Sequence, residues 1–150
     1  MTYKELYNSF KDQTTALNAF FKEFNYGQVL EFNRKDDLEY PNVYFELISG
    51  TNYSFGTDQE TYNCALIFSD ISFEDLNNRI EILSRLNEFV KTYFYFYNEN
   101  YSDQFYIESY TTLFGEELKQ DRVYYIRAEF SVVCLSNKIC TDLQNIATSC

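Results

Sequence analysis

Residues 122–135, RVYYIRAEFSVVCL, carry the longest strand signal in the chain. Their side chains alternate, so that one face is continuously apolar and the other carries charge. A period of two with one apolar face is typical of a strand that buries one side of its sheet. We therefore expect a long strand here, with helices against its apolar face. The apolar face comprises Tyr124, Ile126, Ala128, Phe130, Val132 and Cys134, and the opposite face carries Arg127, Glu129 and Ser131.

Four other segments have strand character. Residues 40–48, YPNVYFELI, alternate cleanly, and Pro41 suits the start of a strand because it cannot donate to a ladder. Residues 49–60 are polar and contain Gly50 and Gly56, which indicates either an exposed loop or an extended hairpin that reaches away from the body. Residues 115–121 suit a hairpin loop. The other predicted strands are residues 28–32, 61–69 and 104–114.

Two long helices are expected. The first starts with Thr2 and Glu5 at the spacing of a capping box and ends near Gly27, which suits a left-handed cap. The second follows Ser72 and Asp75, which have the same spacing. Its apolar sector is wide enough to contact two partners, such as a sheet and either another helix or a neighbouring subunit. The apolar stripes are Tyr3, Leu6, Phe10, Leu17, Phe20, Phe21 and Phe24 in the first helix, and Leu76, Ile80, Leu83, Leu86, Val90 and Phe94, with Ile82, Phe89 and Phe96 beside them, in the second.

These elements follow one another in the order helix, three strands, helix, two strands. Consecutive strands favour antiparallel hairpins, and helices that share one face of a sheet form a second layer. The predicted fold class is therefore α+β: a two-layer sandwich with two long helices on one face of a mostly antiparallel sheet of four to five strands. We expect residues 1–135 to form a single domain, and the polar residues 136–150 to form a C-terminal tail that gains order by docking.

The composition provides packing surface and few groups suited to catalysis. The chain has 150 residues, with 15 Tyr, 15 Phe, no His, no Trp and 4 Gly, and its net charge is −11. Tyr and Phe give large contact areas, whereas histidine bases and glycine-rich phosphate loops are missing from the sequence. The acidic charge argues against a nucleic-acid clamp, which depends on Lys and Arg. We expect no catalytic residue, no cofactor and no enzyme activity.

The cysteines Cys64, Cys134, Cys140 and Cys150 are scattered. With no C-x-x-C pair and no histidine, they predict no metal site. Cys64 and Cys134 lie in apolar, strand-like runs, where a free thiol acts as a small hydrophobic side chain. The first ten residues do not resemble a signal peptide, and no apolar stretch approaches the ~20 residues of a membrane span. These features favour synthesis in a reducing cytoplasm, without a membrane partner.

Several segments resemble one family of virion proteins. They are MTYKELYNSF at 1–10, EYPNVYFEL at 39–47, IFSDISFEDLNN at 67–78 and RAEFSVVCLSNKIC at 127–140. Together with the order of elements, they are similar to the tail-terminator and neck ring proteins of tailed bacteriophages, above all to the small tail ring proteins of crAss-like phages that infect Bacteroidetes. The resemblance covers nearly the whole chain, and its motifs are structural, not catalytic.

The resemblance implies a structural virion protein made in the host cytoplasm. Residues 1–135 would be the ring-subunit domain of a closed homo-oligomer, six- or twelve-fold, stacked between portal-side and tail ring proteins. Genomic DNA would pass through its channel without specific binding, because fixed acidic groups repel phosphate over distances near a Debye length of ~8 Å.

The candidate contact residues are apolar or aromatic, in segments that we expect to be exposed in a single subunit. They are Tyr53, Phe55, Tyr93, Tyr95, Tyr97, Ile139 and Ile146. An alternative function is an acidic intracellular binding module, an adaptor or inhibitor, that engages a basic partner through its charge.

Overall fold

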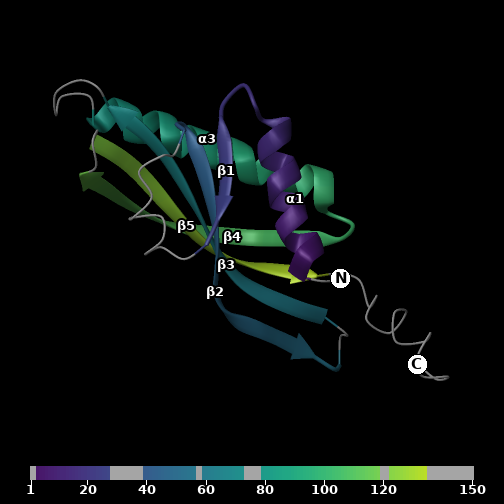
Figure 1. Cartoon of the computed structure of the whole chain (residues 1–150). Helices are drawn as coiled ribbons and strands as arrows, with labels where there is room; N and C mark the ends of the chain where they lie inside the picture. Colours follow the sequence, from purple (N-terminus) through teal and green to yellow (C-terminus); the bar gives the residue numbers. More distant parts are fainter. Residues whose placement is uncertain (1–2, 28–38, 57–58, 73–78, 119–121, 135–150) are drawn as a thin grey trace.

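The computed structural model describes residues 3–27, 39–56, 59–72, 79–118 and 122–134 (Figure 1). These residues form two helices and one sheet of five strands. The elements are α1 (Tyr3–Ala16), β1 (Glu23–Tyr26), β2 (Asn42–Ser54), β3 (Gln59–Ser72), α3 (Arg79–Tyr101), β4 (Phe105–Leu118) and β5 (Arg122–Cys134).

The sheet is mixed, and the predicted fold class was wrong in this respect. Its spatial order is β1-β2-β3-β5-β4. The pairs β2–β3, β3–β5 and β4–β5 are antiparallel, but β1 runs parallel to β2. A parallel pair cannot be joined by a tight hairpin, and residues 27–41 separate β1 from β2 in the sequence. The edge at β1 therefore has a different topology from the antiparallel arrangement that consecutive strands had suggested.

The first helix is shorter than predicted, because α1 ends at Ala16. The amides of Phe20 and Phe21 both bond to the carbonyl of Leu17, so the chain turns there and does not continue as a helix. It then enters β1, which lies in a region predicted to be helical, and Gly27 follows a strand instead of capping a helix. The strand predicted at residues 28–32 lies outside the described residues.

Helix α3 begins at Arg79 in the described part of the chain. Ser72, predicted as the cap of this helix, is instead the last residue of β3. Asp75 and Leu76 lie outside the described residues. Of the predicted stripe, Ile80 is exposed and Leu83 is half-buried. The side chains that α3 buries are Ile82, Leu86, Val90, Tyr93, Phe94 and Tyr97.

Both helices pack against the same face of the sheet. Leu6 and Phe10 of α1 join the buried side chains of α3 in one core cluster with the inward side chains of β2, β3, β4 and β5. The ring of Phe10 stacks on Tyr97 at 4.5 Å between centroids. The alternation of residues 122–135 is confirmed, since their apolar residues are the ones that β5 turns toward this core.

A side-chain amide holds α3 to an irregular point in β4. The β4–β5 register shifts between Ile107 and Tyr110. Beside the shift, Asn98 donates from Nδ2 to the carbonyl of Ile107 (2.7 Å) and accepts from its amide at Oδ1 (3.0 Å). The backbone amide and carbonyl of Ile107 are thus satisfied by a helix side chain next to a bulge, while Ile107 keeps Val132 as its β5 partner.

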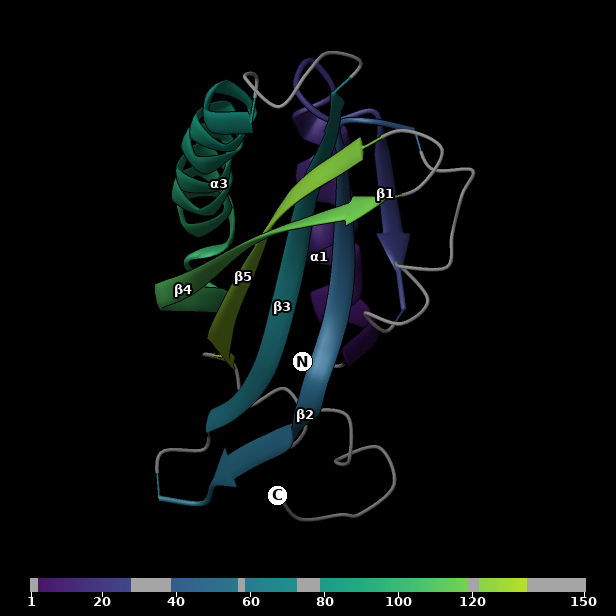
Figure 2. The same cartoon turned by 90° about the vertical axis from the view of Figure 1, so that its left-hand side faces the viewer.

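The described residues between 49 and 60 belong to an extended antiparallel strand pair, in agreement with the extended hairpin, one of the two possibilities left open by the sequence. Strand β2 continues to Ser54, and β3 starts at Gln59. The pair extends past the ends of both helices as an arm (Figure 2). Its register shifts between Leu47 and Thr51, near the point where the arm leaves the body.

Candidate assembly surfaces

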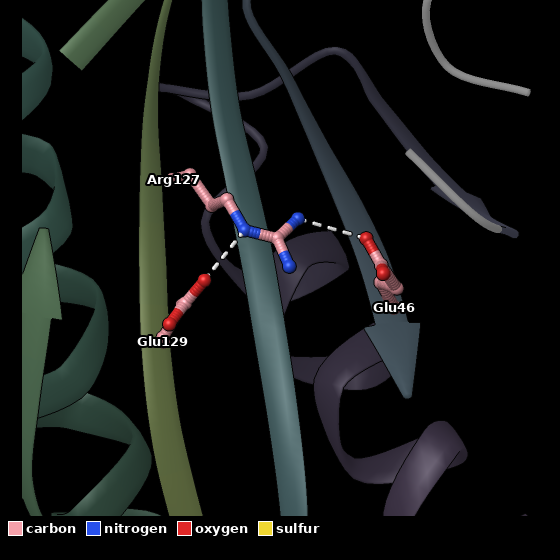
Figure 3. A network of polar contacts seen from close by, with 3 residues as sticks. All are labelled: Glu46, Arg127 and Glu129. Carbon is pink, nitrogen blue, oxygen red and sulfur yellow. Dashed lines mark hydrogen bonds and ion pairs between the residues drawn. The ribbon is translucent and has the colours of Figure 1, made fainter. Parts of the chain in front are cut away.

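The face of the sheet away from the helices carries a partly buried network of charged side chains. Arg127 of β5 donates from Nη1 to Oε2 of Glu46 on β2 at 2.8 Å, and from Nε to Oε1 of Glu129 at 3.0 Å (Figure 3). Only 15% of the Arg127 side chain and 13% of the Glu46 side chain are exposed. Burial lowers the pKa of Arg127, but its hydrogen bonds to the two carboxylates outweigh that effect and leave the pKa raised. The guanidinium is therefore a fixed positive charge that spans from β5 to β2.

The tip of the arm carries the most exposed aromatic side chain of the described residues. Phe55 is 92% exposed. Its ring contacts Tyr53 in an edge-on arrangement, with 5.0 Å between the ring centroids. A phenyl ring in water at the end of a projecting hairpin is an unfavourable arrangement for a lone subunit and a favourable one for a contact. Both residues belong to the set predicted from the sequence.

The outer surface of α3 provides a second aromatic site. Tyr95, another predicted contact residue, is exposed and meets Phe96 edge-on at 5.4 Å. Further toward the start of the helix, Ile80 is 80% exposed. The wide apolar sector of this helix is therefore not fully covered by the described part of its own subunit.

Two of the predicted contact residues are buried instead, so their expected exposure was wrong. Tyr93 and Tyr97 are fully buried between α3 and α1. The Tyr93 hydroxyl donates to the carbonyl of Phe10 (3.0 Å), and the Tyr97 hydroxyl bonds to Ser9 (2.7 Å). Polar groups on α1 thus satisfy both tyrosines within the core. The other two candidates, Ile139 and Ile146, lie outside the described residues.

An apolar site on β4 was missed by the sequence reasoning. Leu113 and Phe114 are consecutive residues near the end of this strand, and Phe114 is 57% exposed. Consecutive side chains of a strand point to opposite faces, so one of them lies on each side of the sheet. Two adjacent large apolar residues at the end of an alternating run are the signal that could have identified this site.

An open pocket of about 780 Å³ lies between the turn that follows α1, the residues just before β2, the end of β3 and helix α3. Within it, Asp70 forms an ion pair with Arg85 and accepts a hydrogen bond from the amide of Ile71. The Asp70 carboxylate is therefore already paired and hydrogen-bonded within its own subunit. Among the described residues, no group of three or more Cys, Asp or Glu side chains is placed to hold a metal ion. The pocket is also lined by Phe20, Lys22, Glu39 and Phe89.

Among the described helices, none has the length and apolar character needed to cross a membrane. No protein-family model matches this chain, and no curated protein matches its sequence.

Proposed function

We propose that this protein is a structural virion protein: a subunit of a neck or tail ring that joins the portal side of a tailed bacteriophage to its tail and forms a channel for the genome. The observation that carries the proposal is the distribution of exposed apolar side chains. They gather at the tip of the arm, on the outer surface of α3 and near the end of β4. A subunit in the middle of an assembly needs contacts on several sides, whereas a monomer keeps its apolar patches few and small.

The arm supports this role through its geometry. The end of β2 extends beyond the ends of both helices (Figure 2), and Phe55, which follows this strand, is 92% exposed. A contact between the arm of one copy and a different surface of the next is head-to-tail. Such contacts close into a ring when the rotation per subunit divides a full turn. Copies of the chain and the adjoining portal-side and tail rings are the partners that the proposal implies.

The charge of the chain supports a channel through which DNA slides. The net charge of the chain is −11. On the open face of the sheet, the positive charge of Arg127 is paired with the carboxylates of Glu46 and Glu129. Phosphate binding depends on accessible Lys and Arg side chains. An acidic lining therefore repels DNA at short range and offers few points of adhesion.

Quantitative mass spectrometry of gradient-purified particles tests the proposal, with the portal protein as the internal standard for copy number. We expect the chain to be present in the particles at a fixed ring stoichiometry, and a map of the neck and tail to contain its fold with the arm in contact with a neighbour. Absence from purified particles would overturn the proposal. Recovery in host lysate on a basic protein, in a salt-sensitive complex, would then favour the acidic binding module.

A further inference from the structure

The two edges of the sheet differ in a way that matters for assembly. Among the described residues, β4 pairs only with β5 and β1 pairs only with β2. Strand β4 contains 14 residues, with no Pro and no Lys in its sequence. Edge strands of monomeric proteins are usually kept short or protected by Pro, charged side chains, bulges or a covering helix, because their unpaired backbone groups bind other strands. In β4 the register shift and the Asn98 side chain of α3 protect the region of Ile107, but residues 110–115 contain no charge, no Pro and no register shift.

Strand directions determine how two copies can join at these edges. Along the order β1-β2-β3-β5-β4, the first pair is parallel and the next three are antiparallel. Strand β4 therefore runs opposite to β1. When two copies stand side by side in the same orientation, as in a ring, β4 of one copy meets β1 of the next as an antiparallel pair. This is the slightly more stable way for two strands to pair.

We propose that β4 of one subunit pairs with β1 of a second copy of this chain, so that the sheet continues from subunit to subunit. The inference rests on the proposed ring function, because it names the contact between neighbouring copies. We infer the register in which Phe114 lies opposite Phe24 of the next copy, and Glu116 opposite its Lys22.

Side-chain orientation supports this register. Phe24 is the β2 partner of Val43, and Phe114 is the β5 partner of Ile126, so both point to the helix face. In the joined sheet they form a cross-strand aromatic pair. Tyr26, which is 53% exposed, lies diagonally from Phe114 on the same face. Two exposed aromatic side chains, one on each edge, thus become neighbours.

Charge supports the same register. Lys22 and Glu116 are both exposed. Glu116 is the β5 partner of Tyr124 and so lies on the helix face, and Lys22 directly precedes β1, so that extending this strand by one residue brings Lys22 to the same face. Opposite charges directly across two strands are favourable, and like charges are unfavourable. Moving the pairing by two residues, so that Tyr26 lies opposite Phe114, would instead place the apolar Phe24 opposite Glu116 and separate Lys22 from Glu116. The proposed register keeps that pair of opposite charges together.

Cysteine cross-linking between two separate single variants tests the pairing. Lys22→Cys and Glu116→Cys are made in a full-length background with Cys140→Ser and Cys150→Ser, which keeps the buried Cys64 and Cys134. The two proteins are mixed at high concentration and oxidised by oxygen with copper phenanthroline, then separated on a non-reducing gel. Side chains directly opposite across two antiparallel strands are close enough for a disulfide. We expect a mixed disulfide dimer as the main product, and a ladder of multimers from the Lys22→Cys/Glu116→Cys double variant.

The matched control is Ile80→Cys, at an exposed residue of α3, mixed with Lys22→Cys. It is expected to give only a minor amount of mixed dimer. The proposal is overturned if Lys22→Cys and Glu116→Cys link no better than the control, or if Glu116→Cys alone links to itself as the main product, which would indicate a two-fold β4–β4 contact. Failure of the ring function is a separate result: the chain would be missing from particles whatever the cross-linking shows.

Discussion

The aromatic ring of Tyr125 on β5 lies over Gly115, its partner across the β4–β5 ladder. A methyl group placed on Gly115 would overlap the end of that ring. Tyr125 is also packed against the small buried cluster of Tyr44 and Ile67 on the open face of the sheet. The absence of a side chain at Gly115 thus leaves room for the ring of Tyr125, and this ring covers part of the open face of the sheet.

The substitution Gly115→Ala is expected to lower the free energy of unfolding by about 1–3 kcal/mol, the usual cost of overpacking. Urea denaturation followed by circular dichroism measures it. Gly56→Ala is the matched control, since a Cβ there meets nothing within 4 Å and the change should stay within about 0.5 kcal/mol. Equal effects at the two glycines would contradict the role of Tyr125.

Replacement of Arg127 by Met is expected to destabilise the protein by about 1–3 kcal/mol, because it leaves the mostly buried Glu46 without its charged partner. Glu129→Gln should lower the free energy of unfolding by less, since the Glu129 side chain is 46% exposed and water can solvate the substituted side chain. The double variant Glu46→Gln/Arg127→Met should recover part of the loss. If Arg127→Met and Glu129→Gln have the same effect in chemical denaturation, the network does not act as described.

Alkaline pH should unfold the protein in a way that depends on its buried tyrosines. Burial raises the pKa of Tyr93 and Tyr97 above their ordinary value, and hydrogen bonds from Thr14 and Ser9 only partly oppose this. The folded state therefore keeps protons that the unfolded state releases. Their contribution to stability is fully present below pH ~10 and is lost as the pH rises above it.

Stability measured by urea between pH 8 and 11 should fall above pH ~10, and the slope should be smaller in Tyr93→Phe/Tyr97→Phe. Ultraviolet absorbance should show the buried Tyr93 and Tyr97 ionising during the global unfolding transition. An unchanged slope in the double variant would assign the alkaline transition to other groups.

Phe55→Ser is expected to leave the free energy of unfolding of the isolated subunit within about 0.5 kcal/mol, because the side chain is already 92% exposed. Its effect should appear in particles, where complementation with the variant should give few complete tails. Asn8→Ser, at an exposed position of α1 outside the three candidate assembly surfaces, is the control for a surface substitution as such. Normal particle yield with Phe55→Ser would exclude the tip of the arm from assembly.

The limits of the sequence prediction follow from particular residues. Residues 122–135 could be identified as a strand because burial on one face imposes a period of two. Residues 17–26 could not be assigned in the same way, since the spacing of Phe20, Phe21 and Phe24 fits a helix, while Phe24 and Tyr26 also fit one face of a strand. Nothing in the local pattern indicates that β1 joins β2 in parallel, because that choice depends on a long crossover.

Among the candidate contact residues, too, some could be predicted from the local sequence and others could not. Phe55 could be predicted because its segment is polar and rich in turn residues. The burial of Tyr93 and Tyr97 could not, because it depends on hydrogen-bond partners about 80 residues earlier in the chain. Whether a tyrosine lies in a core or on a surface depends on such distant polar groups, which periodicity does not encode.

The span of Arg127 has a mechanical consequence. Its guanidinium crosses the whole width of β3 to reach Glu46, so it ties together two strands that are not neighbours. A pull along β5 is then transmitted to β2 through this link as well as through the backbone bonds of the strand between them. For the three strands to slide past one another, the partly buried ion pair between Arg127 and Glu46 must break. A sheet with this ion pair therefore resists shear better than a sheet held by backbone hydrogen bonds alone.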